Sequence, residues 1–187
     1  MKTLVLDPIH QDAVEYGNKN LDLILWNEVT EEDFLDAEAV IVRIYPIDKK
    51  IIDKMKSLKI IAKHGVGVDN IDLNYAKEKN VVVTNTPTAN MESVAEFVVG
   101  LALNCYRKIS ESFNEIKGGL NKIAPGNLTG YELNGKTVGL IGLGKIGKSV
   151  GNKFKHAFNM KICIYDPFAS IEDCTALGFS KVDTLED

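Results

Sequence analysis

The amino-acid sequence predicts an α/β protein in which parallel strands alternate with helices. Short runs rich in Val, Ile and Leu recur over residues 1–85, and the polar stretches between them have helical spacing. Further along, the glycine motif Gly142-x-Gly144-x-x-Gly147 lies between another apolar run and another helical stretch. The chain has 187 residues, 45% of them hydrophobic and 26% charged, which is enough to bury one large core or two smaller ones.

Five apolar runs in the first half of the chain predict five strands. Each run is short and largely unalternated, which is typical of strands buried on both faces of a parallel sheet. The runs are residues 3–7, 21–26, 39–44, 59–65 and 81–85. The stretches between them, such as 48–57 and 72–80, have helical spacing. Together these units predict a doubly wound sheet with helices on both faces.

Residues 91–117 predict one long helix. Asn90 is a candidate N-cap, Glu92 suits the first turn, and Gly118-Gly119 is a natural stop. The first half of this stretch is apolar nearly all round, so the helix must be covered on several sides. We interpret it as the element that joins two domains, and we expect a homodimer through helix 91–117.

A second βαβ unit follows a Gly-, Pro- and Asn-rich connection that we expect on the surface. Its strands are predicted at 137–141 and 161–166, and its helix at about 145–158. This unit contains the glycine motif.

Charge and cysteine content exclude several classes of partner and environment. The net charge of −4 and the pI near 5.5 argue against a nucleic-acid or anionic-membrane partner, which would favour a basic face. Three cysteines without C-x-x-C spacing indicate reduced thiols in a cytoplasmic protein. No apolar run is long enough for a signal peptide or a membrane span, and we expect no metal site.

The glycine motif fulfils the conditions for a dinucleotide-binding loop. It follows a strand and opens a helix, and Asp166 ends the next strand 19 positions after Gly147 (166 − 147). Gly142 permits the tight turn, Gly144 lets a pyrophosphate approach the backbone, and Gly147 lets helix and strand pack closely. Asp166 favours NAD over NADP, because its carboxylate would repel a 2′-phosphate and no Arg follows it in the sequence. The alternative is a glycine turn in an α/β domain with a helix-capping Asp.

A second glycine pair, Gly65-x-Gly67, follows the fourth predicted strand. Ligands of open α/β sheets bind beyond the carboxyl ends of the strands. The N–H groups of Val66 and Gly67 could form a nest for a carboxylate. Alternatively, this is a strand-to-helix turn in which Asp69 caps the helix, and both interpretations can hold together.

Three stretches of the sequence resemble the D-2-hydroxyacid dehydrogenases, a family that includes D-3-phosphoglycerate dehydrogenase. They read HGVGVDNIDL, VVVTNTPTANMESVAEFVVGLAL and ELNGKTVGLIGLGKIG with YDP, and they cover most of residues 59–167. The resemblance implies an α/β chain with a flavodoxin-like substrate domain at 1–90 and the first half of a Rossmann NAD-binding domain at 91–187. It implies hydride transfer between the nicotinamide of NAD and C2 of a small 2-hydroxy or 2-keto acid, in the cleft between the two domains.

The resemblance also implies roles for residues toward the cofactor. Lys145 and Ile146 would contact the pyrophosphate through their backbone, together with the three motif glycines. Asp166 would bind the adenosine ribose, and Val66 would lie near the nicotinamide.

Toward the substrate, the resemblance implies four residues. Val66 and Gly67 would offer amides to the substrate carboxylate. Arg43 matches a position where phosphoglycerate-type members have an Arg that meets substrate anions, although a surface ion pair explains it as well. Lys63 falls where those members often have a second Arg, and a lysine loses the bidentate fork. A phosphorylated substrate such as 3-phosphoglycerate therefore stays open.

The catalytic His, Glu and Arg of the family come from a later part of the nucleotide domain than this chain contains, so we assign no catalytic residue. His64 ends a strand beside the expected substrate cleft, but the catalytic His of the family does not come from that position. We expect the N-terminal part of a longer dehydrogenase or a truncated product, inactive alone, with strands 1 and 2 of the nucleotide sheet and an open hydrophobic edge. The alternative is a non-catalytic NAD-binding or dimerisation module.

Overall fold

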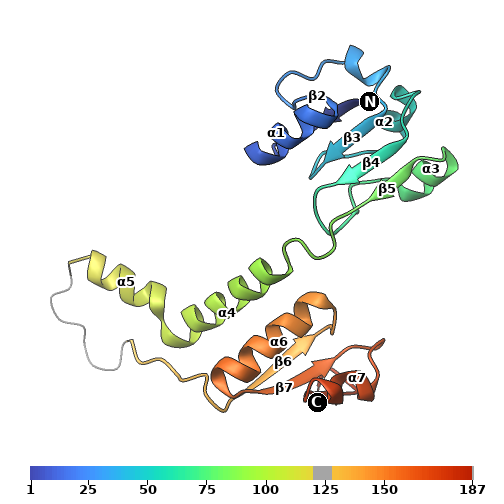
Figure 1. Ribbon diagram of the computed structural model, residues 1–187. Helices are drawn as coiled ribbons and strands as arrows, with labels where there is room; N and C mark the ends of the chain where they lie inside the picture. The colour runs from blue at the N-terminus through green and yellow to red at the C-terminus, as the bar shows by residue number, and fades with distance from the viewer. Residues whose placement is uncertain (120–127, 187) are drawn as a thin grey trace. The chain divides into compact units, whose positions relative to one another are not determined.

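Two parallel sheets organise the chain (Figure 1). The computed structural model describes residues 1–119 and 128–186. The chain divides into two units, Met1–Ala89 and Asn90–Asp187, and each contains one of the sheets.

The first unit contains a five-stranded sheet in the order β2-β1-β3-β4-β5. All of its strand pairs are parallel, and the five predicted strands are confirmed, although each is shorter than its apolar run. The strands are β1 (Lys2–Val5), β2 (Asp22–Ile24), β3 (Ala39–Val42), β4 (Ile60–Lys63) and β5 (Val82–Thr84). The helices are α1 (Gln11–Asn20), η1, a short 3-10 helix (Glu32–Phe34), α2 (Lys49–Lys54) and α3 (Leu73–Glu78).

The core of the first unit forms on its central strands. Leu4, Val40 and Ile61 lie on β1, β3 and β4 and are fully buried. Because these strands have neighbours on both sides and apolar residues on both faces, the runs show almost no alternation. Asp48 and Asp72 cap α2 and α3 by accepting backbone N–H groups, which fixes where each short helix begins.

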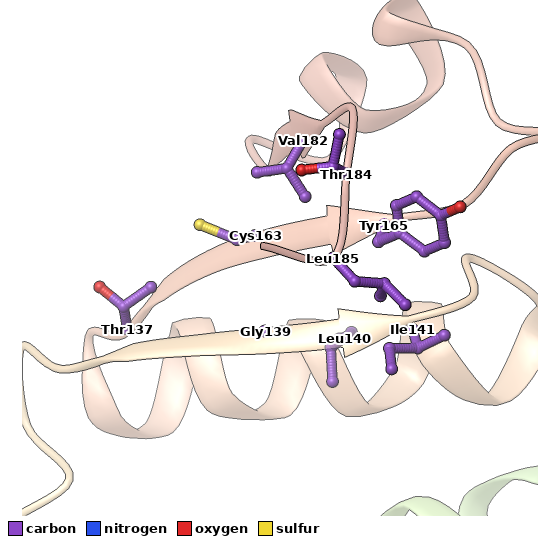
Figure 2. A pocket seen from close by; sticks show the side chains of 9 residues that line it. All are labelled: Thr137, Gly139, Leu140, Ile141, Cys163, Tyr165, Val182, Thr184 and Leu185. Atoms are coloured by element: carbon purple, nitrogen blue, oxygen red, sulfur yellow. The ribbon is translucent and has the colours of Figure 1, made fainter. Parts of the chain in front are cut away.

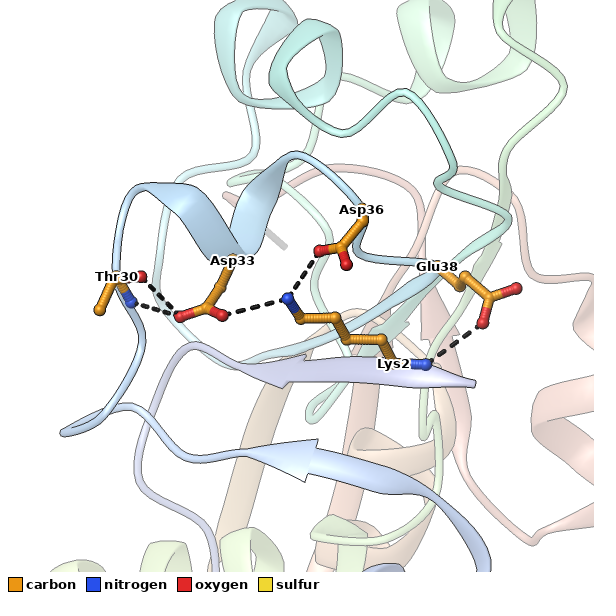
Figure 3. A network of polar contacts seen from close by, with 5 residues as sticks. All are labelled: Lys2, Thr30, Asp33, Asp36 and Glu38. Carbon is orange, nitrogen blue, oxygen red and sulfur yellow. Dashed lines mark hydrogen bonds and ion pairs between the residues drawn. The ribbon is translucent and has the colours of Figure 1, made fainter.

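A polar network fastens the first strand to the chain that precedes β3 (Figure 3). The Lys2 ammonium lies 2.6 Å from Asp36 and 3.1 Å from Asp33. The N–H and hydroxyl groups of Thr30 both donate to Asp33 and, with Lys2, lower the pKa of that carboxyl to about 2. The Asp36 carboxylate in turn raises the pKa of the Lys2 ammonium.

The second unit contains a three-stranded parallel sheet in the order β6-β7-β8. Its elements are β6 (Thr137–Ile141), α6 (Lys145–Phe158), β7 (Lys161–Tyr165), α7 (Ile171–Ala176) and β8 (Ser180–Val182). The predicted bounds of β6 and α6 are confirmed, whereas β7 ends at Tyr165, one residue earlier than predicted. The expectation of only two complete strands was wrong, because β8 pairs with β7 from Cys163 to Tyr165.

The predicted continuous helix over residues 91–117 is two helices, α4 (Met91–Arg107) and α5 (Ile109–Lys117). Lys108 between them has φ +51°, in the left-handed region that ends a right-handed helix. The side-chain oxygen of Asn104 accepts hydrogen bonds from the backbone N–H and the hydroxyl of Ser110, which starts the new helix. As predicted, α5 ends at Gly118.

Helix α4 packs against α6 rather than on the sheet itself. Ala95 is fully buried in a cluster that includes Val150 and Phe154 of α6. Glu92 accepts hydrogen bonds from Ser149 and Lys153 and so ties the first turn of α4 to α6. Asn90 is the N-cap residue of α4, as predicted, but its side chain makes no capping hydrogen bond.

One face of the second sheet is open in the described part of the chain, and a hollow lies on it (Figure 2). Side chains of the other face, such as Ile162 and Ile164, are buried against the helices. On the open face Ile141 is 79% exposed, and a hollow of about 380 Å³ lies over β6, β7 and the segment after β8. Within the described part of the chain, β6 pairs with β7 alone, so the expected open hydrophobic edge is confirmed.

The described residues contain no helix that is both long and apolar enough to cross a membrane. The thiols of Cys105, Cys163 and Cys174 are free, and burial raises the pKa of the Cys174 thiol.

The two faces of the second sheet predict losses of stability of different size for the same truncation. Ile164→Ala removes a fully buried side chain and should lower the free energy of unfolding by about 2–5 kcal/mol. Ile141→Ala, on the neighbouring strand and the open face, should cost less than about 1 kcal/mol. Urea unfolding followed by circular dichroism measures both, and Trp26 fluorescence reports separately on the first unit. Equal costs would contradict the assignment of a covered and an open face.

Candidate functional site

The glycine loop joins the end of β6 to the start of α6. Gly142 has φ +98°, a conformation that side chains rarely adopt. A Cβ on Gly147 would lie 2.3 Å from the Gly142 oxygen, so helix and loop approach too closely for any other residue. A Cβ on Gly144 would meet nothing within 4 Å and would project into open space. The loop therefore has two glycines that its fold requires and one that keeps its surface clear.

The start of α6 offers backbone donors to a ligand. Gly144 is the N-cap, and no side chain caps the helix. The first N–H groups of a helix have no partner within the helix, and the helix dipole favours an anion there. Lys145 and Ile146 are the first two residues of the helix, so their amides belong to this anion-binding end.

Asp166 follows β7 and reaches the glycine loop. One of its carboxylate oxygens accepts the Leu143 N–H at 2.7 Å, and the other accepts the Phe168 N–H at 2.8 Å. These two hydrogen bonds hold the pKa of the carboxyl below its ordinary value of 3.8. Asp166 is not a helix cap, since Ser170 caps the following helix. The Ala169 N–H makes a smaller contribution to this lowered pKa, and the carboxylate keeps acceptor capacity for a hydroxyl donor.

In the first unit, the Gly65–Gly67 loop is fastened to the chain after β5. Gly65 donates its N–H to the Thr86 hydroxyl at 3.0 Å and accepts the Thr86 N–H at 2.9 Å. The Asn85 side chain donates to the Val66 oxygen at 2.8 Å. The N–H groups of Val66 and Gly67 have no acceptor among the residues that the structure describes.

The helix after this loop is not capped as the sequence suggested. Asp72, rather than Asp69, accepts the N–H of Tyr75 at 2.9 Å and caps α3. Asp69 is exposed, and one of its carboxylate oxygens lies 3.0 Å from the point where a Gly67 Cβ would lie.

Arg43 and Lys63 differ in what their side chains contact. Arg43 follows β3, is exposed and has no ion-pair partner within residues 1–119 and 128–186. The surface ion pair considered for it is therefore absent from this part of the protein. The Lys63 ammonium donates to the Arg43 backbone oxygen and to the Asn70 side chain.

Asp7, which no sequence motif indicated, organises the loop beyond β3. The Asp7 side chain accepts the backbone N–H groups of Arg43, Ile44 and Tyr45 at 2.6, 3.0 and 3.0 Å, and the residue is only 6% exposed. An acidic residue two positions after a fully buried strand was the available signal, because buried carboxylates need partners.

Comparison with known proteins decides the family. The family model described as "D-isomer specific 2-hydroxyacid dehydrogenase, catalytic domain" matches residues 3–185.

The chain belongs to the D-isomer specific 2-hydroxyacid dehydrogenase family.

Relatives of this chain within the family include two curated proteins of different names. D-3-phosphoglycerate dehydrogenase of Archaeoglobus fulgidus is 39% identical over an alignment that covers 98% of this chain and 35% of the relative. Hydroxypyruvate reductase of Thermotoga maritima is 40% identical, with 97% and 60% covered. The chain thus spans between about a third and 60% of the length of these relatives.

A solved D-lactate dehydrogenase of Aquifex aeolicus, complexed with NAD and lactic acid, superposes with a TM-score of 0.83. It is 30% identical, and the match covers 98% of this chain and 56% of the other.

The hydrogen bonds to Asp166 predict a pH dependence of the second unit of this family member. Because the folded-state pKa is lowered, the stabilisation is fully present above about pH 4 and is lost as the pH falls through the folded value. Asp166→Asn should therefore flatten the loss of stability between pH 5 and about pH 2. Urea midpoints measured across that range test this, with the exposed Asp183→Asn as control. An unchanged slope in Asp166→Asn would contradict it.

Proposed function

We propose that the chain is part of an NAD-dependent oxidoreductase that transfers a hydride between the nicotinamide and C2 of a small 2-hydroxy or 2-keto acid. The observation that carries this proposal is the glycine loop with Asp166 beside it. The order β2-β1-β3-β4-β5 supports a flavodoxin-like substrate domain at residues 1–90. The strands β6-β7-β8 support the first half of a Rossmann domain at residues 91–187.

The proposed cofactor is NAD rather than NADP. The open space in front of Gly144 and the uncapped start of α6 fit a pyrophosphate, which would accept N–H donors from Lys145 and Ile146. Asp166 would accept ribose hydroxyl donors. Its lowered pKa keeps the carboxylate ionised, which disfavours a 2′-phosphate, and Pro167 and Phe168 supply no compensating cation.

The proposed substrate site lies on the first unit, at the carboxyl ends of β3 and β4. The unpartnered N–H groups of Val66 and Gly67 would bind the substrate carboxylate, and Arg43 would add a guanidinium. When bound, the cofactor would supply or accept the hydride, while these residues bind and orient the acid. We further propose that catalytic acid–base groups come from the rest of the protein, so that this chain binds without turnover.

Gly144→Ala separates cofactor binding from folding. The new methyl group meets no protein atom, and the backbone at φ −68°, ψ −175° suits any residue, so the fold should persist. It would occupy the approach of the pyrophosphate, and the dissociation constant for NADH should rise by roughly tenfold or more, about 1.4 kcal/mol. NADH fluorescence titration measures the affinity, and thermal unfolding checks the fold.

Gly100→Ala, a glycine of α4 with equally open surroundings, is the matched control for this substitution. An unchanged affinity in Gly144→Ala would contradict the proposed cradle. Absorbance of NADH with glyoxylate, hydroxypyruvate or phosphohydroxypyruvate tests turnover in the same samples. Turnover by the 187-residue chain would show that the catalytic groups are within it, whereas binding alone also fits a non-catalytic NAD-binding module.

We also propose that α4 and α5 form a homodimer interface. Large apolar side chains remain exposed along both helices: Phe97, Leu101, Tyr106, Ile109, Phe113 and Ile116. The repeat of large exposed apolar residues along two consecutive helices supports an interaction surface, because such side chains are buried when they form one patch.

Phe97→Glu with Phe113→Glu should convert a dimer to a monomer, because four charges would enter one desolvated interface. Light scattering after size exclusion measures the mass. Tyr16→Glu, on the 72%-exposed Tyr16 of α1, should leave the mass unchanged. If Ile141→Glu converted the dimer to a monomer and the helix substitutions did not, the open face of the second sheet would be the interface.

A further inference from the structure

We propose that Lys63 is a positioning residue for Arg43 rather than an anion ligand. The site would therefore take a small 2-keto or 2-hydroxy acid with a single carboxylate and no phosphate. The proposal rests on the proposed function and specifies its substrate class.

Lys63 is occupied by the protein itself. It ends β4 opposite Val42, the last residue of β3, so its side chain starts beside the loop that carries Arg43. Its ammonium donates to the Arg43 backbone oxygen and to the Asn70 side-chain oxygen. Asn70 extends this network to the same loop, because its side-chain amide donates to the Tyr45 backbone oxygen at 2.7 Å.

The loop after β3 is thus held through its backbone N–H groups and through its backbone carbonyl oxygens. Asp7 accepts the N–H groups of Arg43, Ile44 and Tyr45, while Lys63 and Asn70 donate to the oxygens of Arg43 and Tyr45. These contacts fix the backbone from which the exposed Arg43 guanidinium projects. A fixed base reduces the entropy lost when that side chain binds an anion.

The charges that remain match one carboxylate. Lys63 donates two of its N–H groups to neutral oxygens within the protein. Loops 43–48 and 64–72 contain one lysine or arginine, Arg43, and its side chain has no acceptor among the described residues. The Asp69 carboxylate beside Gly67 adds negative charge near the free amides. A phosphorylated acid would bring roughly two further negative charges toward this carboxylate, and like charges repel.

A double-mutant cycle distinguishes positioning from direct contact. Kd values come from NMR shifts of the Val66 and Gly67 amides on titrating the 187-residue chain with glyoxylate or with 3-phosphoglycerate. Lys63→Met should weaken glyoxylate binding by roughly three- to tenfold, but should have little effect when Arg43→Met is already present. The fold-loss should be the same for both ligands, and the wild-type chain should prefer glyoxylate.

Lys59→Met, an exposed lysine just before the same strand, is the matched control and should leave both affinities unchanged. Independent losses from Lys63→Met and Arg43→Met, or a selective loss of 3-phosphoglycerate, would make Lys63 an anion ligand and overturn the proposal. Tenfold tighter binding of 3-phosphoglycerate by the wild-type chain would overturn the substrate class.

Amide hydrogen exchange separates a failure of this inference from a failure of the proposed function. No shift with either ligand would overturn the proposed substrate site and the substrate class with it. Exchange at Arg43, Ile44 and Tyr45 should quicken at least roughly tenfold in Lys63→Met and not in Lys59→Met, with or without ligand. Unchanged exchange would overturn the positioning role by itself.

Discussion

A carboxylate placed just beyond a buried strand determines the geometry of both candidate sites. In the first unit, Asp7 follows β1 and accepts three consecutive N–H groups of the loop after β3. In the second, Asp166 follows β7 and accepts the N–H of Leu143 in the loop after β6. Parallel strands end at a common edge of the sheet, so an acid at one strand end can reach the loop at the next. Loops that carry ligand donors would otherwise have to satisfy these amides with water.

The two carboxylates differ in what they leave available. Asp7 is almost completely buried, and a single oxygen receives all three N–H groups, so its role is internal. Asp166 is half-buried and divides its two hydrogen bonds between its oxygens. The same arrangement thus supports a loop in both units, and in the second it also provides the acceptor that we propose for the ribose.

The sequence predicted the elements better than it predicted their interruptions and contacts. Short apolar runs specify the strands and three spaced glycines specify the loop, because burial and backbone conformation place local demands on residue type. The break at Lys108 was missed because lysine rarely adopts positive φ, and the Asn104 side chain that starts α5 gives no periodic signal. The role of Lys63 could not be predicted either, since a lysine at a strand end gives no sign of whether it faces a ligand or a backbone oxygen.

The glycines of the loop also differ in which substitutions the protein could tolerate during evolution. A side chain at Gly147 would clash with the Gly142 oxygen, so a substitution there would disrupt the fold and be selected against for that reason alone. A Cβ at Gly144 would meet no protein atom within 4 Å, so a substitution there should leave folding unchanged. A gene that changed at Gly144 would still encode a protein able to fold, and under the proposed function only the loss of ligand binding would select against the change.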